Sequence, residues 1–296
     1  MGKLLGLRID VDTYQGALRG LPLLLKILER HNVTGTFFIP GGPDESAKAF
    51  KRVFLQRGYL TKLIRSRAYR MYSPKTIFAG LLGGTKRIVD IPYLPSIPSM
   101  GHEVGIHGLG HTSWHNDFLK TPPTKVRKQM VQAVEAVKRA TGTSPTCSAG
   151  PGWQGGFTSF AVNDDMQFSF ASDTRGYFPF LPQVNGFDFS TPQIPTTLPT
   201  LDELPGGLPP TAADIKGIFD GILQQEFPVY TAHTEMEGGP YPDFLETLLT
   251  FCEVEGVAVV PLSTLLKHAS KTPLPRCLVA QRPLPGRPGT VATQLL

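Results

Sequence analysis

Five polar side chains in this sequence are of the types that perform metal-assisted hydrolysis. Each lies at the end of a short apolar run of the kind that forms a buried strand, or just past it. Parallel α/β barrels carry their chemistry at the C-terminal ends of their strands, so we expect these side chains to meet. Two carboxylates and three imidazoles can hold one divalent metal ion and still leave an acid and a base. The five residues are Asp10, Asp12, His107, His111 and His233.

The clearest metal-binding pattern is the pair His107 and His111, which are four residues apart with glycines between them. Two imidazoles at this spacing can reach one ion from a single turn, and the glycines let that turn leave regular helical geometry. Asp12 would complete a three-ligand site with open positions. The alternative is a structural histidine pair, since His102 and His115 show that the whole region is rich in imidazole.

Asp10 and Asp12 lie on the same side of an extended chain because side chains alternate along a strand. A metal keeps its carboxylate ligand ionised, whereas the neighbouring carboxylate can accept a proton from water that the metal acidifies. The alternative for this pair is a helix N-cap beside a solvated acid. His233 ends a later strand and could protonate a departing amine, or it could be a core residue with satisfied hydrogen bonds.

Two further strand ends carry candidate supporting residues. Asp173 and Arg175 could orient the base or the acid and tune its charge, or they could form a surface ion pair. The glycine-rich loop 149–153 carries Trp153, one of two tryptophans in the chain. An indole in such a loop suits stacking on a sugar ring or lining a pocket, and the alternative is a packed loop.

These residues need a scaffold of parallel strands with helices between them. Short apolar runs predict strands at 4–9, 34–40, 102–107, 146–149, 168–172, 193–198, 228–233 and 257–261. Amphipathic patterns predict helices at 17–31, 124–141, 212–225 and 241–255. Strands that alternate with helices over this length indicate an α/β fold with a parallel sheet, closed or nearly closed into a barrel.

The composition favours one large domain with an insertion and a tail. The chain has 296 residues, of which 41% are hydrophobic and 18% charged, which is enough to bury a sizeable core. We expect one domain at 1–270 and a proline-rich tail at 271–296 that forms an extended, weakly ordered arm. Three widely spaced cysteines without a CxxC pair argue against a disulfide framework and for a reducing compartment.

The stretch 48–89 has an unusual charge pattern, with eleven Lys or Arg residues and no Asp or Glu among aromatic and aliphatic side chains. Such a segment is typical of an interfacial helix that binds anionic lipid headgroups. The alternative is an ordinary solvated helical insertion. The net charge of +5 also suggests an acidic partner. No apolar run approaches the ~20 residues of a spanning helix, so we expect a cytoplasmic protein, or one attached only to a membrane surface.

The order of the motifs resembles that of the polysaccharide deacetylase (NodB-homology) superfamily. That order is a paired-Asp motif, an HxxxH motif, an aromatic loop, an Asp-bearing motif and a final histidine motif. The resemblance spans about residues 3–268 and implies a distorted (β/α)7-type barrel with a basic helical insertion. The matching phrases lie at 7–13, 102–107, 146–149, 172–176, 193–199 and 229–238.

Carried over by position, the resemblance implies that Asp10 is the general base and His233 the general acid. It implies that Asp12, His107 and His111 hold one divalent metal ion, for which Zn²⁺, Mn²⁺, Co²⁺ and Ni²⁺ all remain candidates.

The phrases are most similar to those of deformylases that act on undecaprenyl-phosphate-linked 4-deoxy-4-formamido-L-arabinose. The resemblance therefore implies release of formate, in the aminoarabinose modification of lipid A that confers polymyxin resistance. It also implies a protein held peripherally at the anionic cytoplasmic face of the inner membrane.

One departure from those deformylases concerns the aromatic loop, where they carry Gly-Trp-Arg. In this chain Gln154 follows Trp153. A neutral amide does not replace the charge of a guanidinium, so the phosphate-binding or base-tuning role of that arginine is not carried over.

Two alternatives to this function remain open. The first keeps the chemistry but changes the substrate, giving an N-deacetylase of another amino sugar or of a polysaccharide. The second is a binding module without enzymatic activity, whose basic insertion contacts nucleic acid. The five polar residues argue against the second alternative, and no nucleic acid partner is expected.

Overall fold

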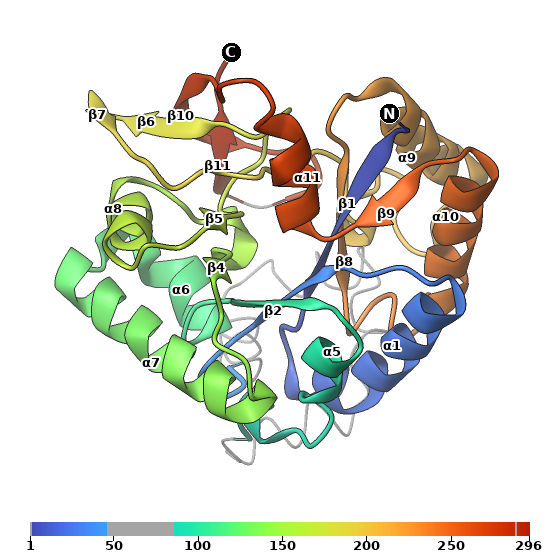
Figure 1. The fold of residues 1–296 in the computed structure, drawn as a ribbon, viewed down its shortest axis with the longest axis horizontal. Coiled ribbons are helices and arrows are strands. Elements are labelled where there is room, and N and C mark those ends of the chain that lie inside the picture. Colours follow the sequence, from blue (N-terminus) through green and yellow to red (C-terminus); the bar gives the residue numbers. More distant parts are fainter. Residues whose placement is uncertain (1, 46–85, 288) are drawn as a thin grey trace, which may run out of the picture.

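The computed structural model describes residues 2–45, 86–287 and 289–296 and shows an α/β fold around a curled parallel sheet (Figure 1). The hydrogen-bonded strand order is β5-β4-β3-β2-β1-β8, and β9 pairs with the beginning of β1. All of these pairings are parallel. The strands are β1 (Leu4–Asp10), β2 (Thr36–Ile39), β3 (Glu103–Ile106), β4 (Cys147–Ser148), β5 (Phe170–Ala171), β8 (Val229–His233) and β9 (Ala258–Val260).

An extended segment at 193–198 fills the space between the two end strands, β5 and β8. On one side, the amide of Ile194 donates to the carbonyl of Ala171 at 2.8 Å. On the other side, the amide of Leu198 donates to the carbonyl of Val229 at 3.2 Å. The strand expected here is therefore reduced to isolated bridges, but the segment brings the sheet close to a closed barrel. The expected α/β class and curled parallel sheet are confirmed.

Helices cover the outside of the sheet (Figure 1). The expected helix at 17–31 begins with a π-helical turn at Gly16–Gly20, and the other three long helices lie within two residues of their predicted bounds. The helix α7 begins at a proline in its first turn and ends before Gly142, whose φ of 78° favours glycine. The α-helices are α1 (Leu21–Arg30), α5 (Ser96–Ser99), α6 (His111–Asp117), α7 (Pro123–Thr141), α8 (Phe157–Asp165), α9 (Ala212–Gln224), α10 (Pro242–Val254) and α11 (Leu262–Ala269).

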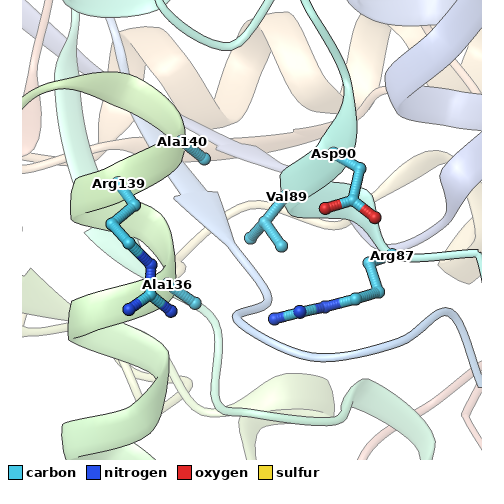
Figure 2. A pocket seen from close by; sticks show the side chains of 6 residues that line it. All are labelled: Arg87, Val89, Asp90, Ala136, Arg139 and Ala140. Atoms are coloured by element: carbon cyan, nitrogen blue, oxygen red, sulfur yellow. The ribbon is translucent and has the colours of Figure 1, made fainter.

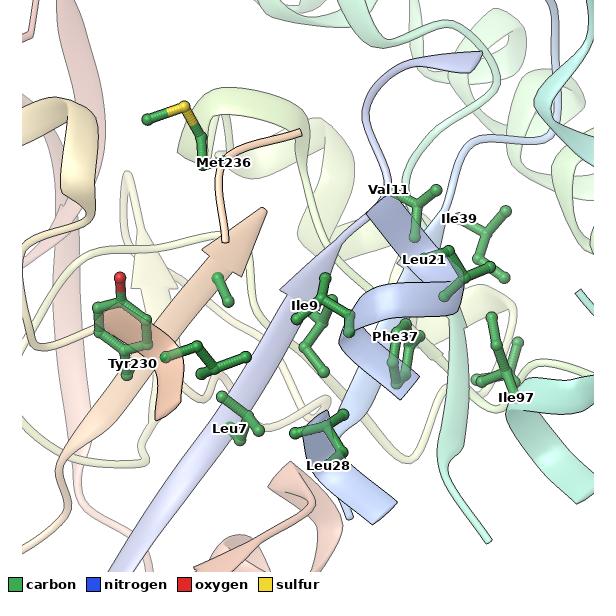
Figure 3. Packing of buried hydrophobic residues seen from close by; sticks show 14 of the residues in the cluster. Leu7, Ile9, Val11, Leu21, Leu28, Phe37, Ile39, Ile97, Tyr230 and Met236 are labelled. Carbon is green, nitrogen blue, oxygen red and sulfur yellow. The ribbon is translucent and has the colours of Figure 1, made fainter. Parts of the chain in front are cut away.

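Side chains of β1 alternate between the helix layer and the barrel interior. Leu5, Leu7 and Ile9 are fully buried in the main hydrophobic cluster, which includes residues of α1 and α10. Figure 3 shows Leu7 and Ile9 near Leu28 of α1 and Phe37 of β2. Because the side-chain period of a strand is two, the residues between them face the interior. Those residues include Arg8 and Asp10, so the strand carries charge inward while its other face stabilises the fold.

The barrel interior is a packed core at the end opposite the candidate site. A second hydrophobic cluster joins Phe38, Cys147 and Phe170 to Leu262 and Leu265 of α11. Glycine is required at position 105, because a Cβ there would lie 2.5 Å from the ring of Phe38 and 2.8 Å from the sulfur of Cys147. The interior therefore offers no channel at this end, and chemistry is confined to the C-terminal ends of the strands.

The C-terminal residues form strands rather than the weakly ordered arm expected from their prolines. The hairpin partners β10 (Arg276–Pro283) and β11 (Thr290–Gln294) extend a second sheet with β6 (Leu181–Val184) and β7 (Phe187–Asp188), in the order β11-β10-β6-β7. Val279 and Ala292 are buried there against Phe160 and Phe180, and Val291 is buried as well. The expectation was wrong because Pro273 and Pro275 precede β10, Pro283 is its last residue and Pro285 lies in the turn, so that these prolines do not interrupt the ladder.

The membrane prediction concerns a part of the chain that is mostly undescribed. The basic stretch 48–89 overlaps residues 46–85, which lie outside the described residues, and its interfacial role stays a prediction. Among the helices of the described ranges, none has the length and apolarity needed to cross a membrane.

Candidate active site

Three of the predicted residues form a compact cluster of potential metal ligands at the C-terminal end of the barrel. Asp12 follows β1, His107 follows β3, and His111 is the first residue of α6. The Nε2 atom of His107 lies 3.3 Å from Oδ1 of Asp12, and Nε2 of His111 lies 3.2 Å from Oδ2 of Asp12. One ligand atom from each residue lies within 4.8 Å of the other two, which is close enough to share one ion.

The hydrogen bonding of the cluster fits a divalent cation. Oδ1 of Asp12 and Nε2 of His107 are buried and have no hydrogen-bond partner among the described residues. Such atoms are costly to bury unless something binds them. The other ring nitrogen of His107, Nδ1, lies 2.9 Å from the carbonyl oxygen of Ala149. A proton on Nδ1 would donate to that carbonyl and leave the lone pair of Nε2 free for a metal.

Electrostatics keep the cluster in the protonation state that a carboxylate ligand needs. Burial opposes ionisation of Asp12, but the imidazoles of His111 and His107 hold the pKa of this carboxyl well below its usual value. Burial conversely favours a neutral His111, and the charge of Asp12 outweighs it and raises the pKa of His111. The carboxylate is therefore anionic and available to a cation.

Asp10 is held by an arginine that the sequence reasoning missed. The Nε and Nη2 atoms of Arg8 donate to the two carboxylate oxygens of Asp10 at 2.8 and 2.7 Å, and both side chains are almost completely buried. Burial raises the pKa of Asp10, but Arg8 and His107 lower it below the usual value overall. The sequence contains a pattern that could have identified this arginine. Arg8 interrupts the apolar run two positions before Asp10, and side chains two apart lie on the same face of a strand.

His233 lies at the end of β8, next to the cluster. Its Nε2 is 3.9 Å from Oδ2 of Asp12, and its backbone amide donates to Glu237 at 2.8 Å. Burial favours the neutral imidazole, but the negative charges of Asp12, Asp10 and Asp202 outweigh it and raise the pKa of His233 to about 9. The structure thus brings all five predicted residues together and leaves His233 able to carry a proton.

The aromatic loop is packed rather than open. Trp153 is only 2% exposed, and its Nε1 donates to Oγ1 of Thr196 at 3.0 Å. The ring has no free face for a sugar, which favours the packed-loop alternative. Gln154 is also buried, and its Nε2 donates to the carbonyl of Thr290 in β11 at 2.6 Å. Position 154 lacks the arginine of the deformylases, but three other guanidinium groups lie near Trp153. The guanidinium carbons of Arg8, Arg175 and Arg287 are all within 5.4 Å of the centroid of its ring.

Asp173 and Arg175 support this loop from β5. Asp173 accepts hydrogen bonds from the amide of Gly150 at 2.6 Å and from Asn163 at 2.9 Å, and burial raises its pKa to about 6. Arg175 pairs with Glu203 at 3.0 Å. Because both residues are buried and bind other groups, the surface ion pair considered from the sequence is excluded.

Comparisons with known proteins identify the family to which this chain belongs. Residues 12–168, just over half of the chain, match the family model described as polysaccharide deacetylase. A relative from Shewanella sediminis is 32% identical over 89% of this chain and 86% of its own length. The chain belongs to the polysaccharide deacetylase family. It is accordingly a hydrolase of the deacetylase and deformylase type, which acts on an amide C–N bond. The Shewanella relative is named a probable 4-deoxy-4-formamido-L-arabinose-phosphoundecaprenol deformylase.

Solved structures of the deacetylase family share the fold. A polysaccharide deacetylase structure from Mycobacterium smegmatis aligns with a TM-score of 0.63 and 21% identity, covering 96% of each chain. A family 4 acetyl xylan esterase from Clostridium thermocellum, in complex with a cobalt ion, aligns with a TM-score of 0.53 and 16% identity. That alignment covers 90% of this chain and 92% of the esterase. At these identities the likeness concerns the fold alone.

A shallow pocket elsewhere on this family member contains none of the site residues (Figure 2). It is lined by Arg87, Val89 and Asp90 on one side and by Ala136, Arg139 and Ala140 of α7 on the other. Figure 2 shows the two arginine side chains in this pocket.

Proposed function

We propose that this chain is a metal-dependent deformylase. Its substrate would be undecaprenyl-phosphate-linked 4-deoxy-4-formamido-L-arabinose, from which it releases formate. The observation that carries the proposal is the Asp12, His107 and His111 cluster, with two unpartnered buried ligand atoms and with Asp10 and His233 beside it. The choice of formyl sugar is supported by the relatives from Shewanella sediminis and Wigglesworthia glossinidia, which carry this deformylase name at 32% and 29% identity.

Asp12, His107 and His111 would hold the ion. A divalent cation there supplies a Lewis acid that polarises the amide carbonyl and lowers the pKa of water. A cobalt ion is bound by the Clostridium thermocellum esterase, which shares the fold, and this supports a divalent metal in the proposal. Zn²⁺, Mn²⁺, Co²⁺ and Ni²⁺ all suit a site of two imidazoles and one carboxylate.

Asp10 would act as the base. Its Oδ2 atom lies 3.5 Å from Nε2 of His107, so the carboxylate borders the cluster. Arg8 keeps this carboxylate ionised and fixes its orientation through two hydrogen bonds. An oriented, ionised carboxylate can take the proton from the attacking water as the carbonyl carbon is attacked.

His233 would act as the acid. A pKa of about 9 leaves its imidazole protonated at neutral pH, and its Nε2 faces the cluster beside Asp12. A proton donated from this nitrogen to the amine of the sugar makes the amine a good leaving group when the C–N bond breaks. The base and the acid are thereby supplied by different strands, β1 and β8.

The substrate would be reached at the cytoplasmic face of the inner membrane, in the modification of lipid A with aminoarabinose that confers polymyxin resistance. The net charge of +5 favours an anionic lipid surface. Within a catalytic domain at 1–270 we assign membrane contact to the basic stretch 48–89, on the strength of its sequence alone. The proline-rich residues 271–296 follow this domain.

A formate-release assay on the lipid-linked formamido sugar tests the reaction. We expect turnover by the purified protein, loss of turnover after chelation, and recovery when Zn²⁺, Mn²⁺, Co²⁺ or Ni²⁺ is added singly. Full activity in metal-free protein would contradict the mechanism. A parallel assay with the acetylated sugar decides the substrate, because faster release of acetate would favour the N-deacetylase alternative.

Flotation with liposomes tests the membrane assignment. We expect binding to vesicles that contain anionic phospholipid, weaker binding to purely zwitterionic vesicles, and loss of binding at high salt. Salt-sensitive binding to RNA or DNA without any affinity for anionic vesicles would instead support the binding-module alternative.

A further inference from the structure

The C-terminal hairpin, defined here as residues 276–294, is bonded directly to the loop that carries Trp153. Gln154 donates to the carbonyl of Thr290 at 2.6 Å, and Gln281 donates to the carbonyl of Gly155 at 3.0 Å. The backbone amide of Arg175 donates to the carbonyl of Ala292 at 2.8 Å. These bonds join β10 and β11 to two different loops at the C-terminal end of the barrel.

The turn of this hairpin places Arg287 against the same tryptophan. The guanidinium carbon of Arg287 lies 4.6 Å from the centroid of the Trp153 ring, which is within cation–π distance. Its Nη1 atom lies 3.2 Å from Glu203 and 3.7 Å from Asp202. The preceding residue, Gly286, has a φ of 84°, and a Cβ there would lie 2.7 Å from the carbonyl oxygen of Glu203. Glycine therefore allows the close approach that delivers the arginine.

Both neighbours of Arg287 lead to His233. Trp153 donates to Thr196, whose hydroxyl lies 2.8 Å from that of Thr231 in β8, two residues before His233. Asp202 is the second neighbour, because its Oδ2 atom lies 3.7 Å from Nη1 of Arg287. The positive charges of His233 and Arg287 lower the pKa of Asp202 although burial opposes its ionisation. The Arg287 side chain is 16% exposed, so it is an ordered part of the wall that still borders solvent.

We propose that Arg287 is a positioning residue for the hydrolytic reaction, which holds Trp153 and Asp202 in place, keeps the Thr196–Thr231 contact next to His233, and makes the C-terminal hairpin part of the active site. This inference deepens the proposed function and rests on it for the reaction. The acid would lose its orientation without Arg287, while the metal ligands, which follow β1 and β3 or begin α6, would stay in place.

Kinetics of Arg287→Ala test the role, with Arg282→Ala as the matched control. Arg282 carries the same charge on the same hairpin but is exposed on β10. We expect Arg287→Ala to lower kcat for formate release by about tenfold or more, because a misplaced catalytic group is costly. KM should stay within about threefold, and Arg287→Lys should recover part of kcat. Added guanidinium ion should raise kcat of Arg287→Ala and leave the control unchanged. Equal kcat in Arg287→Ala and the control would overturn the proposal.

Tryptophan fluorescence gives a readout that needs no substrate. The chain has two tryptophans, so a Trp114→Phe background reports on Trp153 alone. In this background we expect Arg287→Ala to increase acrylamide quenching of Trp153, and Arg282→Ala to leave it unchanged, with thermal melts confirming that each variant is folded. Unchanged quenching in folded Arg287→Ala would refute the positioning of Trp153. Absence of formate release by the wild type would refute the proposed function, and the quenching result would still decide the placement of Arg287.

Discussion

The mouth of the barrel has two sides that are built in different ways. On the strand-end side, Asp12, His107 and His233 come from the ends of β1, β3 and β8, which belong to one parallel sheet, so the sheet register fixes their separations. On the loop side, Trp153 is held by polar contacts from segments far apart in the sequence, including the C-terminal hairpin. The comparison indicates that the reacting groups are placed by the backbone of the core, whereas their surroundings are placed by side chains.

Each side also uses a guanidinium in a different way. Arg8 is fully buried and forms a bidentate pair with Asp10, so loss of its charge would destabilise the barrel. Arg287 borders solvent and contacts two carboxylates at longer range. We therefore expect changes on the strand-end side to affect both folding and metal binding, and changes on the loop side to affect turnover with a small cost in stability and no loss of metal.

The largest effect is expected for Asp12→Asn, which tests the metal ligands on the strand-end side. The neutral amide loses the anionic ligand, so we expect formate release to fall by more than about a hundredfold, beyond the usual effect of losing an outer partner of a metal ligand. Metal content after dialysis should fall with it. Asp243→Asn, at an exposed position in the first turn of α10, is the matched control and should keep both properties. Full metal content with full activity in Asp12→Asn would contradict the assignment.

A double-mutant cycle tests the buried pair on the same side. Arg8→Met leaves the carboxylate of Asp10 buried without its partner, which should lower the free energy of unfolding by about 3–5 kcal/mol. Adding Asp10→Asn removes the uncompensated charge, so the double variant should regain much of that stability while remaining inactive. Urea denaturation measures both. Equal stability of the single and double variants would show that the pair is not coupled.

His102 precedes β3, at the end of the strand away from the active site, and its pKa differs from that of His233. Burial lowers its pKa to about 4 there, whereas carboxylates raise that of His233 at the mouth. The unfolded chain takes up a proton near pH 6.5 and the folded protein only near pH 4, so stability should fall as the pH drops between these values. The loss should be about 2 kcal/mol after allowance for partial solvation.

The variant His102→Asn serves as the control for that pH effect. Its amide oxygen can still accept the hydrogen bond that the amide of Gly35 donates to Nδ1 of His102 at 3.2 Å. Thermal melts at a series of pH values should show a flatter profile for this variant than for the wild type. An unchanged profile would assign the pH dependence to other groups.

The smallest effect is expected on the loop side, at Gln154. The substitution Gln154→Ala removes one hydrogen bond to Thr290 and should cost about 1 kcal/mol of unfolding free energy. Metal content should equal that of the wild type, since no metal ligand is touched. Loss of metal from this variant would show that the two sides of the mouth are not independent.

The strand-end side was largely predictable from the sequence, because the position of a residue at the end of an apolar run also gives its position on a parallel sheet. Arg8 was missed although the alternation of β1 indicates it. The loop side was not predictable from the sequence. The strand β10 pairs with β6, which is nearly a hundred residues away, and the prolines between Lys271 and Pro288 make a strand pattern hard to recognise. Burial of Trp153 depends on three arginines from distant segments, which no local pattern reveals.

The pairing of the C-terminal hairpin with the Trp153 loop has a consequence for synthesis of the protein on the ribosome. Asp10, Asp12 and His233 all precede the hairpin in the chain, so the barrel and its metal cluster can assemble before the hairpin has left the ribosome. Arg287 lies in the hairpin and is translated after them. We therefore expect a released chain that ends before residue 276 to acquire metal without turnover, so that the enzyme is active only when the hairpin is present.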